Sequence, residues 1–391
     1  MNNKVGLAIV TYTINYGTFL QAFATQAAIR ALGYETEILN INSVIHHVSS
    51  ARKRYFLKQL LNIAELISYR HTISAIVAKK LNKTYRCYML RREKCFKEFS
   101  DKQFSIGKKC DGWQGLSQHC ENFSSIVVGS DQLWRPANIA GNFYTLNFVP
   151  DHINKVSYAT SFGLKEIRPN QKDIASAFLG RIQYLSCREE SGTNIIKNLT
   201  GRSAKVVCDP TLLLQQRDWD RFLVPTPIIE GDYVLTYLLS NNKKHREYAR
   251  KLAEKTSCKV VGILHGAGYI SGDEHHVDEA PVDVGPFDFL NLIKHAKYVC
   301  TDSFHGCVFS TVFHKDFYAF KRFSDKDKMS TNTRVTGLLS KFGLSHRIVE
   351  DYNEISLDPI CYDEVGERVE DFRKYSLNFL SDSLKQNKEV I

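Results

Sequence analysis

The chain has 391 residues, 43% of them hydrophobic and 24% charged, which is typical of a globular protein long enough for two domains. No stretch approaches the roughly 20 apolar residues of a membrane span. We expect no signal peptide, because the first apolar run, residues 5–10, lacks a basic leader and a cleavage pattern. The ten cysteines contain no CxxC pair and no zinc-type spacing, so we expect reduced thiols in a cytoplasmic protein and no metal site.

The net charge of +10 is concentrated in one segment. Residues 51–97 contain thirteen Lys or Arg and two acids, a net charge of +11, so the remainder of the chain is close to neutral. This distribution argues against a generally cationic nucleic-acid-binding protein and indicates a local anionic partner.

The N-terminal segment predicts a βαβ unit. Residues 4–11 are almost entirely apolar, as in a buried parallel strand, and residues 34–41 form the next strand. Between them lie a polar loop at residues 13–21 and an amphipathic helix that ends before Gly33. Such a loop at a strand's C-terminal end is where α/β folds bind ligands, and this one has neither a GxGxxG nor a P-loop lysine motif.

Residues 46–120 interrupt the α/β pattern with two expected amphipathic helices, at residues 57–67 and 73–95. The polar faces of these helices are rich in Lys and Arg, and four tyrosines lie at their borders: Tyr55, Tyr69, Tyr85 and Tyr88. One interpretation is a solvated helical insertion. The other is peripheral docking of residues 51–97 on the anionic inner surface of the plasma membrane or on a diphosphate-linked lipid, because such surfaces favour basic helices with interfacial aromatic residues.

The α/β pattern resumes with a core strand at residues 126–128, which is followed by a polar loop. In this loop Asp131 suits a general base or a ligand for a sugar hydroxyl, and Trp134 suits stacking on a sugar ring. The alternatives are a helix N-cap for Asp131 and a core position for Trp134.

Two further strands end in candidate binding loops. The strand at residues 155–160 leads to residues 161–163, and the strand at residues 183–187 leads to Arg188. The guanidinium of Arg188 can hold a carboxylate or a phosphate bidentately, and the alternative is a surface salt bridge with Glu190 or a neighbour.

A second βα series follows the proline-containing segment 212–229, which we interpret as the domain junction. Its strands are expected at residues 233–239, 259–264, 298–301 and 316–320. A histidine-rich loop at residues 265–276 fits no common zinc pattern, so a flexible loop is the preferred interpretation.

The turn at residues 301–306, Thr-Asp-Ser-Phe-His-Gly, places His305 at the N-terminus of a helix. A histidine there can transfer protons near neutral pH, and the helix N-terminus favours a bound anion. Lys321 and Arg322 follow the neighbouring strand, where two cations could neutralise a phosphate and a carboxylate together; an exposed basic turn is the alternative.

These elements predict an α/β fold with two Rossmann-like domains facing a central cleft, as in GT-B glycosyltransferases. We expect an N-terminal domain at residues 1–211 with the basic helical insertion at 46–120, a C-terminal domain at 212–350, and a C-terminal helical segment at 351–391 that packs back on the first domain. The strand-end loops would line the cleft with anion binders, acid/base groups and sugar-type hydrogen-bonding residues. This combination suits a transferase acting on an anionic donor and a hydroxyl-rich acceptor.

Six motifs, found in order between Val5 and about Arg347, resemble the polysaccharide pyruvyl transferase family. They are Asn15-Tyr16-Gly17 with Leu20-Gln21, Gly129-Ser130-Asp131-Gln132-Leu133-Trp134, Ser157-Tyr158-Ala159-Thr160-Ser161-Phe162-Gly163, Arg188-Glu189 with Ser191-Gly192, Asp209-Pro210-Thr211-Leu212-Leu213, and Thr301-Asp302-Ser303-Phe304-His305-Gly306. Each motif is short, whereas the ordered series is specific. The basic insertion is the least family-like part of the chain.

The resemblance implies an enzyme that transfers the enolpyruvyl unit of phosphoenolpyruvate onto two hydroxyls of one sugar of a surface-polysaccharide or exopolysaccharide precursor. The products are a cyclic pyruvate ketal and phosphate, no cofactor is expected, and the acceptor is expected to be linked to undecaprenyl diphosphate. By similarity, His305, Arg188 and Lys321 are the functional positions, although Arg322 adjoins Lys321 and the spacing from the histidine to this lysine is short.

The remaining predicted site residues are Asp131, in a catalytic role toward the acceptor, and a set of substrate contacts: Asn15, Tyr16, Gly17, Gln21, Ser130, Gln132, Trp134, Ser161, Phe162, Gly163, Glu190, Ser303, Phe304, Gly306 and Arg322. In the mechanism that we expect, Arg188 and Lys321 hold the phosphate and the carboxylate of the donor, and His305 acts as acid or base. Two other functions remain open: a GT-B glycosyltransferase that uses a nucleotide sugar, and a membrane-surface scaffold without turnover.

Overall fold

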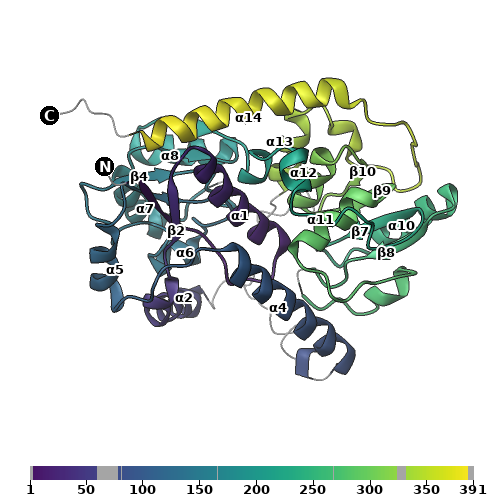
Figure 1. Ribbon diagram of the computed structural model, residues 1–391, viewed down its shortest axis with the longest axis horizontal. Helices are drawn as coiled ribbons and strands as arrows, with labels where there is room; N and C mark the ends of the chain where they lie inside the picture. Colours follow the sequence, from purple (N-terminus) through teal and green to yellow (C-terminus); the bar gives the residue numbers. More distant parts are fainter. Residues whose placement is uncertain are drawn as a thin grey trace.

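The computed structural model describes residues 3–59, 78–80, 82–164, 166–266, 268–323 and 332–385. Within these ranges the chain forms two separate four-stranded parallel sheets, each surrounded by helices (Figure 1). This is an α/β fold with two Rossmann-like domains of the GT-B type, so the predicted fold class is confirmed.

The first sheet has the strand order β2-β1-β3-β4. Its strands are β1 (Lys4–Ala8), β2 (Glu35–Ile38), β3 (Ser125–Val128) and β4 (Asn154–Ser157). All four residues of β3 are buried, because helices cover both faces of a parallel sheet and a continuous apolar run is then the stable sequence. The two-residue strands β5 (Ser186–Cys187) and β6 (Lys205–Val206) pair with each other beside β4, where we predicted longer strands.

The second sheet has the order β10-β9-β7-β8. Its strands are β7 (Tyr233–Tyr237), β8 (Lys259–Gly262), β9 (Tyr298–Thr301) and β10 (Asp316–Ala319). Because all of its pairs are parallel, the C-terminal ends of these strands lie along one edge of the sheet. The turn that carries His305 follows β9 at this edge.

The helices of the first domain are α1 (Tyr16–Ala31), α2 (Ile45–Gln59), α4 (Lys83–Gln103), α5 (Gly112–Cys120), α6 (Pro136–Gly141), α7 (Lys172–Gly180) and α8 (Glu190–Thr200). Those that follow are α9 (Gln216–Asp220), α10 (Lys243–Thr256), α11 (Pro286–His295), α12 (Phe304–Val312), α13 (Asn332–Lys341) and α14 (Tyr362–Leu384). Short 3-10 helices occur at η1 (Ile41–Ser43), η2 (Pro169–Gln171), η3 (Pro210–Leu212), η4 (Asp273–His276) and η5 (Ser345–Arg347). The predicted helix at residues 57–67 lies mostly outside the described residues.

The two domains share one hydrophobic core that runs from α1 to α11 and α12. Tyr16 of α1 stacks on Phe289 of α11 with ring centroids 4.7 Å apart, and its hydroxyl donates a hydrogen bond to the Val284 carbonyl at 3.0 Å. Aromatic residues from both domains surround this contact. The space between the domains is therefore packed beneath the strand ends.

Helix α14 connects the second domain back to the first and spans both of them in Figure 1. The backbone N–H of Cys208 donates to Ser376 Oγ at 2.9 Å, and Asn154 Nδ2 donates to the Ser383 carbonyl at 2.8 Å. These hydrogen bonds attach the second half of α14 to the first sheet, where we expected the C-terminal segment to pack.

Helix α4 belongs to the basic insertion and packs against the second domain. The buried Arg92 donates from Nη2 to the Leu264 carbonyl at 2.8 Å and lies over the Tyr88 ring, 4.6 Å from its centroid. Tyr88 in turn donates to the Pro281 carbonyl at 3.2 Å, and Tyr85 contacts the ring of His265. The interpretation of Tyr85 and Tyr88 as membrane-facing residues is therefore wrong, because both are buried between domains.

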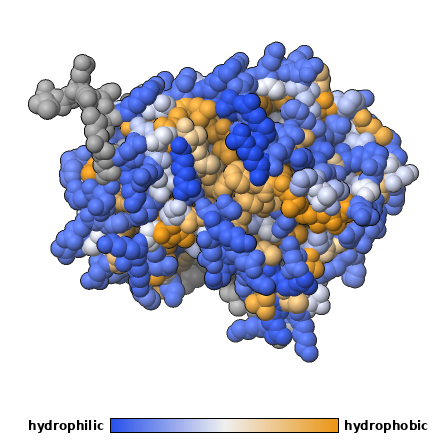
Figure 2. Space-filling model, viewed as in Figure 1, coloured by the Kyte–Doolittle hydropathy of each residue, from blue (hydrophilic) through white to orange (hydrophobic). Residues whose placement is uncertain are grey.

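The exposed surface of α4, at the bottom of Figure 2, is mostly hydrophilic. Among the described residues, no helix combines the length and the apolar character needed to cross a membrane. The docking of residues 51–97 on a membrane surface stays a prediction.

Candidate active site

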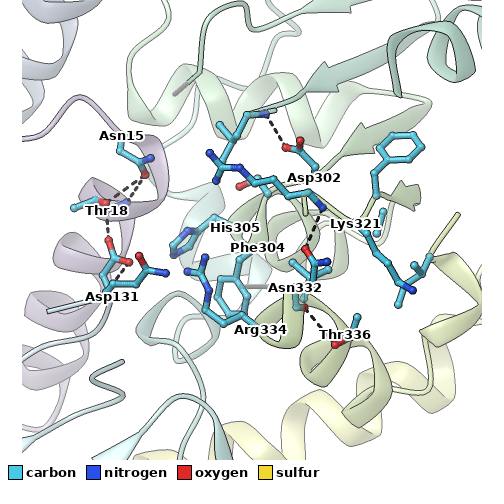
Figure 3. A pocket seen from close by; sticks show the side chains of 18 residues that line it. Asn15, Thr18, Asp131, Asp302, Phe304, His305, Lys321, Asn332, Arg334 and Thr336 are labelled. Atoms are coloured by element: carbon cyan, nitrogen blue, oxygen red, sulfur yellow. Dashed lines mark hydrogen bonds between the residues drawn. The ribbon is translucent and has the colours of Figure 1, made fainter. Parts of the chain in front are cut away.

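A cavity of about 180 Å³ lies where the C-terminal ends of strands from both sheets meet. The first domain contributes Asn15, Thr18, Asp131 and Gln132 to its wall. The second domain contributes Asp302, Ser303, Phe304, His305, Lys321, Arg322, Asn332 and Arg334, among others. Figure 3 shows His305 and Arg334 side by side, facing Asp131 across the cavity. The strand-end turns that we singled out in the two domains thus meet at one place.

His305 is positioned by the turn between β9 and α12. Ser303 is the N-cap of α12, and its Oγ accepts a hydrogen bond from the Gly306 N–H at 3.3 Å. The Asp302 carboxylate accepts hydrogen bonds from the backbone N–H groups of Leu239 and Ser240, at 2.6 and 2.9 Å, which ties the turn to the end of β7. The imidazole therefore projects from a helix start that is fixed on both sides.

Gly17 leaves the space that the His305 ring occupies. A Cβ at this position would lie 1.9 Å from His305 Nδ1 and 2.3 Å from Cγ, which is far inside contact distance. Any larger residue at the start of α1 must displace the imidazole. We predicted Gly17 as a substrate contact. In the structure its lack of a side chain instead leaves space for the His305 ring.

Substitution Gly17→Ala is expected to abolish most of the activity while the fold persists. Alanine favours a helix over glycine by about 1 kcal/mol, so the loss would come from displacement of His305 rather than from helix propensity. Gly366→Ala in α14 is the matched control, because an added Cβ there meets no atom. Equal activity of the two variants in a steady-state assay would contradict this account.

Asp209 joins the two predicted functional residues Arg188 and His305. Its Oδ2 lies 2.8 Å from Arg188 Nη1 and 3.6 Å from His305 Nε2, and it accepts a hydrogen bond from Ser130 Oγ at 2.9 Å. Its Oδ1 accepts hydrogen bonds from the backbone and the hydroxyl of Thr211, at 3.1 and 2.7 Å. The carboxylate is fully enclosed and holds the arginine and the imidazole in fixed positions.

The carboxylates of Asp209 and Asp131 are both held in the ionised form. Burial alone would raise the pKa of Asp209, but His305 and Arg188 outweigh burial and bring the pKa well below its ordinary value. The same balance, with Arg188, His305 and the Thr18 hydroxyl opposing burial, lowers the pKa of Asp131. Asp131 Oδ2 accepts from Thr18 Oγ1 at 2.7 Å, and its φ of 76° shows a backbone in the left-handed region.

Arg188 lies behind the cavity wall and is almost fully buried. Its guanidinium stacks on the Phe304 ring at 4.4 Å from the centroid, and its ion pair is with Asp209, not with Glu190 as the alternative interpretation supposed. Glu190 is exposed at the start of α8, whereas Glu189 Oε2 lies 3.8 Å from Arg188 Nε. Within the described residues, Arg188 Nε and Nη2 have no hydrogen-bond acceptor.

Lys321 and Arg322 line the cavity at the end of β10. Lys321 Nζ forms an ion pair with the exposed Glu350 at 2.9 Å. The Arg322 and Phe323 backbone N–H groups both donate to Asn332 Oδ1 at 3.1 Å, so the first residue of α13 is attached to this loop. Both cations therefore lie at the same cavity as His305.

Of the predicted substrate contacts, the cavity wall contains Asn15, Gln132, Ser303, Phe304 and Arg322. Ser130, Ser161, Gly163 and Gly306 lie behind the wall; Ser130 binds Asp209, and Ser161 Oγ donates to Glu189 Oε1 at 2.5 Å. Asn15 is also the N-cap of α1, where its Oδ1 accepts from the Thr18 N–H at 3.0 Å.

Four of the predicted substrate contacts are core residues: Tyr16, Gln21, Trp134 and Phe162. Trp134 is fully buried, donates from Nε1 to the Tyr144 carbonyl at 3.0 Å and packs on Phe162, so its predicted stacking on a sugar is wrong and the core alternative holds. Tyr16 belongs to the core between the domains. Gln21 is fully buried and donates to the Thr18 carbonyl at 2.9 Å.

The predicted set lacks Thr18, Asp209 and Arg334, among other site residues. Asp209 follows the β6 strand closely and precedes a proline, the same kind of strand-end position as Asp131, so the pattern could have identified it. Arg334 gives no such signal, because it lies in a helix that reaches the cavity only in the folded chain.

His265 of the histidine-rich loop is held by groups of the protein. His265 is buried, with Nε2 3.1 Å from Glu274 Oε1, and its Nδ1 accepts a hydrogen bond from the Ile270 N–H at 3.2 Å. No group of three or more potential metal ligands occurs in the part of the chain that the structure describes.

Comparison with known proteins places these features in a family. The family model of polysaccharide pyruvyl transferase matches residues 15–322, which include His305, Arg188, Asp209 and Lys321. No curated protein sequence matches the chain.

Several solved structures are similar at low sequence identity. UDP-N-acetylglucosamine 2-epimerase from Rickettsia bellii is 9% identical over 99% of each chain, with a TM-score of 0.43. UDP-GlcNAc 2-epimerase from Neisseria meningitidis is 8% identical over 96% of this chain and 99% of that one, with a TM-score of 0.45. ADP-heptose LPS heptosyltransferase II from E. coli is 9% identical over 99% and 100%, with a TM-score of 0.35. None of these similarities bears on the function of the chain. From the match over residues 15–322, the chain belongs to the polysaccharide pyruvyl transferase family.

Proposed function

We propose that the protein transfers the enolpyruvyl group of phosphoenolpyruvate onto two hydroxyls of one sugar in a polysaccharide precursor, giving a cyclic ketal and phosphate. The observation that carries this proposal is one cavity lined by His305, Asp131 and three cations, Lys321, Arg322 and Arg334, in which His305 and Arg334 face Asp131 (Figure 3). A donor with a phosphate and a carboxylate needs several cations, and an acceptor hydroxyl needs a nearby carboxylate or amide. Membership of the family supports the pyruvyl transfer itself.

The second-domain side of the cavity suits the anionic donor. Lys321 and Arg322 reach it from β10, and the N-terminus of α12 adds positive partial charge at residues 303–306. Arg188, which we assigned to direct donor binding, supports the site from behind through its contacts with Phe304 and Asp209. Its positive charge still favours an anion in front of Phe304.

The reaction requires protonation of the donor's methylene carbon and addition of a sugar hydroxyl oxygen to the neighbouring carbon. The hydroxyl proton passes to a base. The bond from that carbon to the phosphate oxygen then breaks and phosphate leaves, and the second hydroxyl closes the ketal with loss of its own proton. His305 is the proton-transfer group in this proposal, because its ring lines the cavity and is oriented by the ionised Asp209.

The first-domain side suits the sugar acceptor. Asn15, Asp131 and Gln132 offer amide and carboxylate groups to hydroxyls, and the ionised Asp131 can accept the proton of an attacking hydroxyl or orient it. We propose an acceptor carried on undecaprenyl diphosphate, with the basic residues 51–97 directed toward an anionic membrane surface; the local net charge of +11 supports this.

A donor screen tests the proposal. The protein is incubated with a pool of lipid-linked and free oligosaccharides and with phosphoenolpyruvate or a set of nucleotide sugars, and released phosphate or nucleotide is measured. We expect acceptor-dependent phosphate release from phosphoenolpyruvate alone. Nucleotide release from a nucleotide sugar would instead indicate a glycosyltransferase.

A further inference from the structure

Arg334 occupies the cavity wall from the first turn of α13. Asn332, two residues earlier, accepts hydrogen bonds from Arg322 and Phe323 and donates from Nδ2 to the Phe323 carbonyl at 2.7 Å. This attachment fixes the start of α13 to the loop that carries Lys321 and Arg322. The Arg334 guanidinium is thereby placed next to His305 (Figure 3).

Within the described residues, no carboxylate forms an ion pair with Arg334. With the Gln132 amide oriented so that its oxygen faces the guanidinium, Nη1 and Nη2 lie 3.1 and 3.0 Å from that neutral oxygen. Arg334 Nε is buried without a hydrogen-bond acceptor among the described residues. The nearest acids, Asp131 and Glu189, are already bound by Thr18 and Ser161.

Other cations surround Arg334 instead. Burial, together with the neighbouring charges of Arg188 and Arg322, lowers the pKa of Arg334 to about 10, and Asp131 and Glu189 oppose this shift only in part. A lowered pKa means that the protonated form is less stable in the folded chain than in the unfolded chain. The charge therefore costs folding stability at every pH below about 10, and this cost disappears as the pH rises through that value.

A half-buried cation whose charge opposes folding is best explained by a ligand that neutralises it. We propose that Arg334 is the side chain that binds the phosphate group of the donor, in front of Arg188. The inference rests on the proposed function in taking this phosphate to be that of phosphoenolpyruvate. The guanidinium lines the cavity and can donate to a phosphate oxygen there, and Lys321 and Arg322, which line the same cavity, would meet the carboxylate.

Substitution Arg334→Gln tests the assignment by thermal denaturation with and without inorganic phosphate. Without phosphate, we expect the Tm of the variant to rise above that of the wild-type protein, because an uncompensated buried charge is removed. With phosphate, the Tm of the wild-type protein is expected to rise and that of the variant to stay unchanged. Hydrogen bonds to charged groups are worth about 1.5–3 kcal/mol, so phosphate affinity should fall about tenfold to a hundredfold.

Lys341→Gln is the control, because it removes the same charge from the exposed end of the same helix. This variant should keep the phosphate-dependent rise in Tm and should not gain stability. A lower Tm of Arg334→Gln without phosphate, or an undiminished response to phosphate, would overturn the assignment and indicate a structural arginine. The proposed function fails separately, if phosphate binds through Arg334 but phosphoenolpyruvate supports no ketal formation.

Discussion

Substitution His305→Gln is expected to lower the turnover of pyruvyl transfer by about a hundredfold to ten-thousandfold, the range in which general acid–base groups contribute. Glutamine has a similar length and can still hydrogen-bond toward Asp209, which lies 3.6 Å from the ring, so the turn and its N-cap should persist. It cannot transfer a proton near neutral pH. We therefore expect the loss in kcat at saturating phosphoenolpyruvate, with a much smaller change in donor affinity measured by calorimetry.

His275→Gln provides the control for this variant. His275 is an exposed histidine of the same domain on η4, away from the cavity. Its replacement should leave kcat unchanged. If His305→Gln retains full turnover, His305 does not carry the proton transfer, and another group must do so.

Substitution Asp209→Asn is expected to reduce both activity and stability. The change removes the negative charge that lies 2.8 Å from Arg188 and faces His305. Among the described residues, the buried guanidinium then keeps only the more distant acids Glu189 and Asp131, at 3.8 and 3.9 Å. Loss of one partner from a buried ion pair costs about 3–5 kcal/mol of unfolding free energy, measurable by urea denaturation at neutral pH. Asp151→Asn, which breaks an exposed pair with Arg181, should change the unfolding free energy far less.

The effect of Asp209→Asn should depend on pH in a defined direction. Because the pKa of Asp209 lies below its ordinary value of 3.8 in the folded chain, its stabilising contribution is present above about pH 4. The contribution is lost as the pH falls below 3.8 toward the lower pKa of the folded state. The difference in unfolding free energy between wild-type and variant should shrink over that window. A difference that stays constant down to the acid transition would show that Asp209 is not held in the ionised form by its neighbours.

The fold follows from the sequence because buried parallel strands have a strong local signature. The apolar run of β3, for example, is buried at every position. The order of these runs and their polar strand ends was enough to predict two Rossmann-like domains and the meeting of residues 13–21, 129–134 and 302–306. Strand bounds were less predictable: β5 contains two residues where a longer strand was expected, because tertiary pairing beside β4 determines its length.

The contacts of individual side chains could not be predicted in the same way. Trp134 and Tyr16 belong to motifs next to the cavity, but burial of a large ring is more favourable than its exposure, and both point into cores. Helix α4 has a basic amphipathic pattern, which suits packing on a membrane surface as well as packing on the second domain. Only the folded chain shows that Arg92 is buried against Leu264. Arg334 reaches the cavity through the attachment of α13 to the loop at Arg322, a contact that local sequence does not encode.

The central claim is that this cavity forms a pyruvate ketal from phosphoenolpyruvate. The most direct measurement is mass spectrometry of candidate lipid-linked oligosaccharides incubated with the protein and isotopically labelled phosphoenolpyruvate. We predict that one oligosaccharide gains the mass of a labelled pyruvate ketal with the wild-type protein and not with His305→Gln. Acceptors that gain a hexose from a nucleotide sugar instead, with no incorporation of label, would contradict the account.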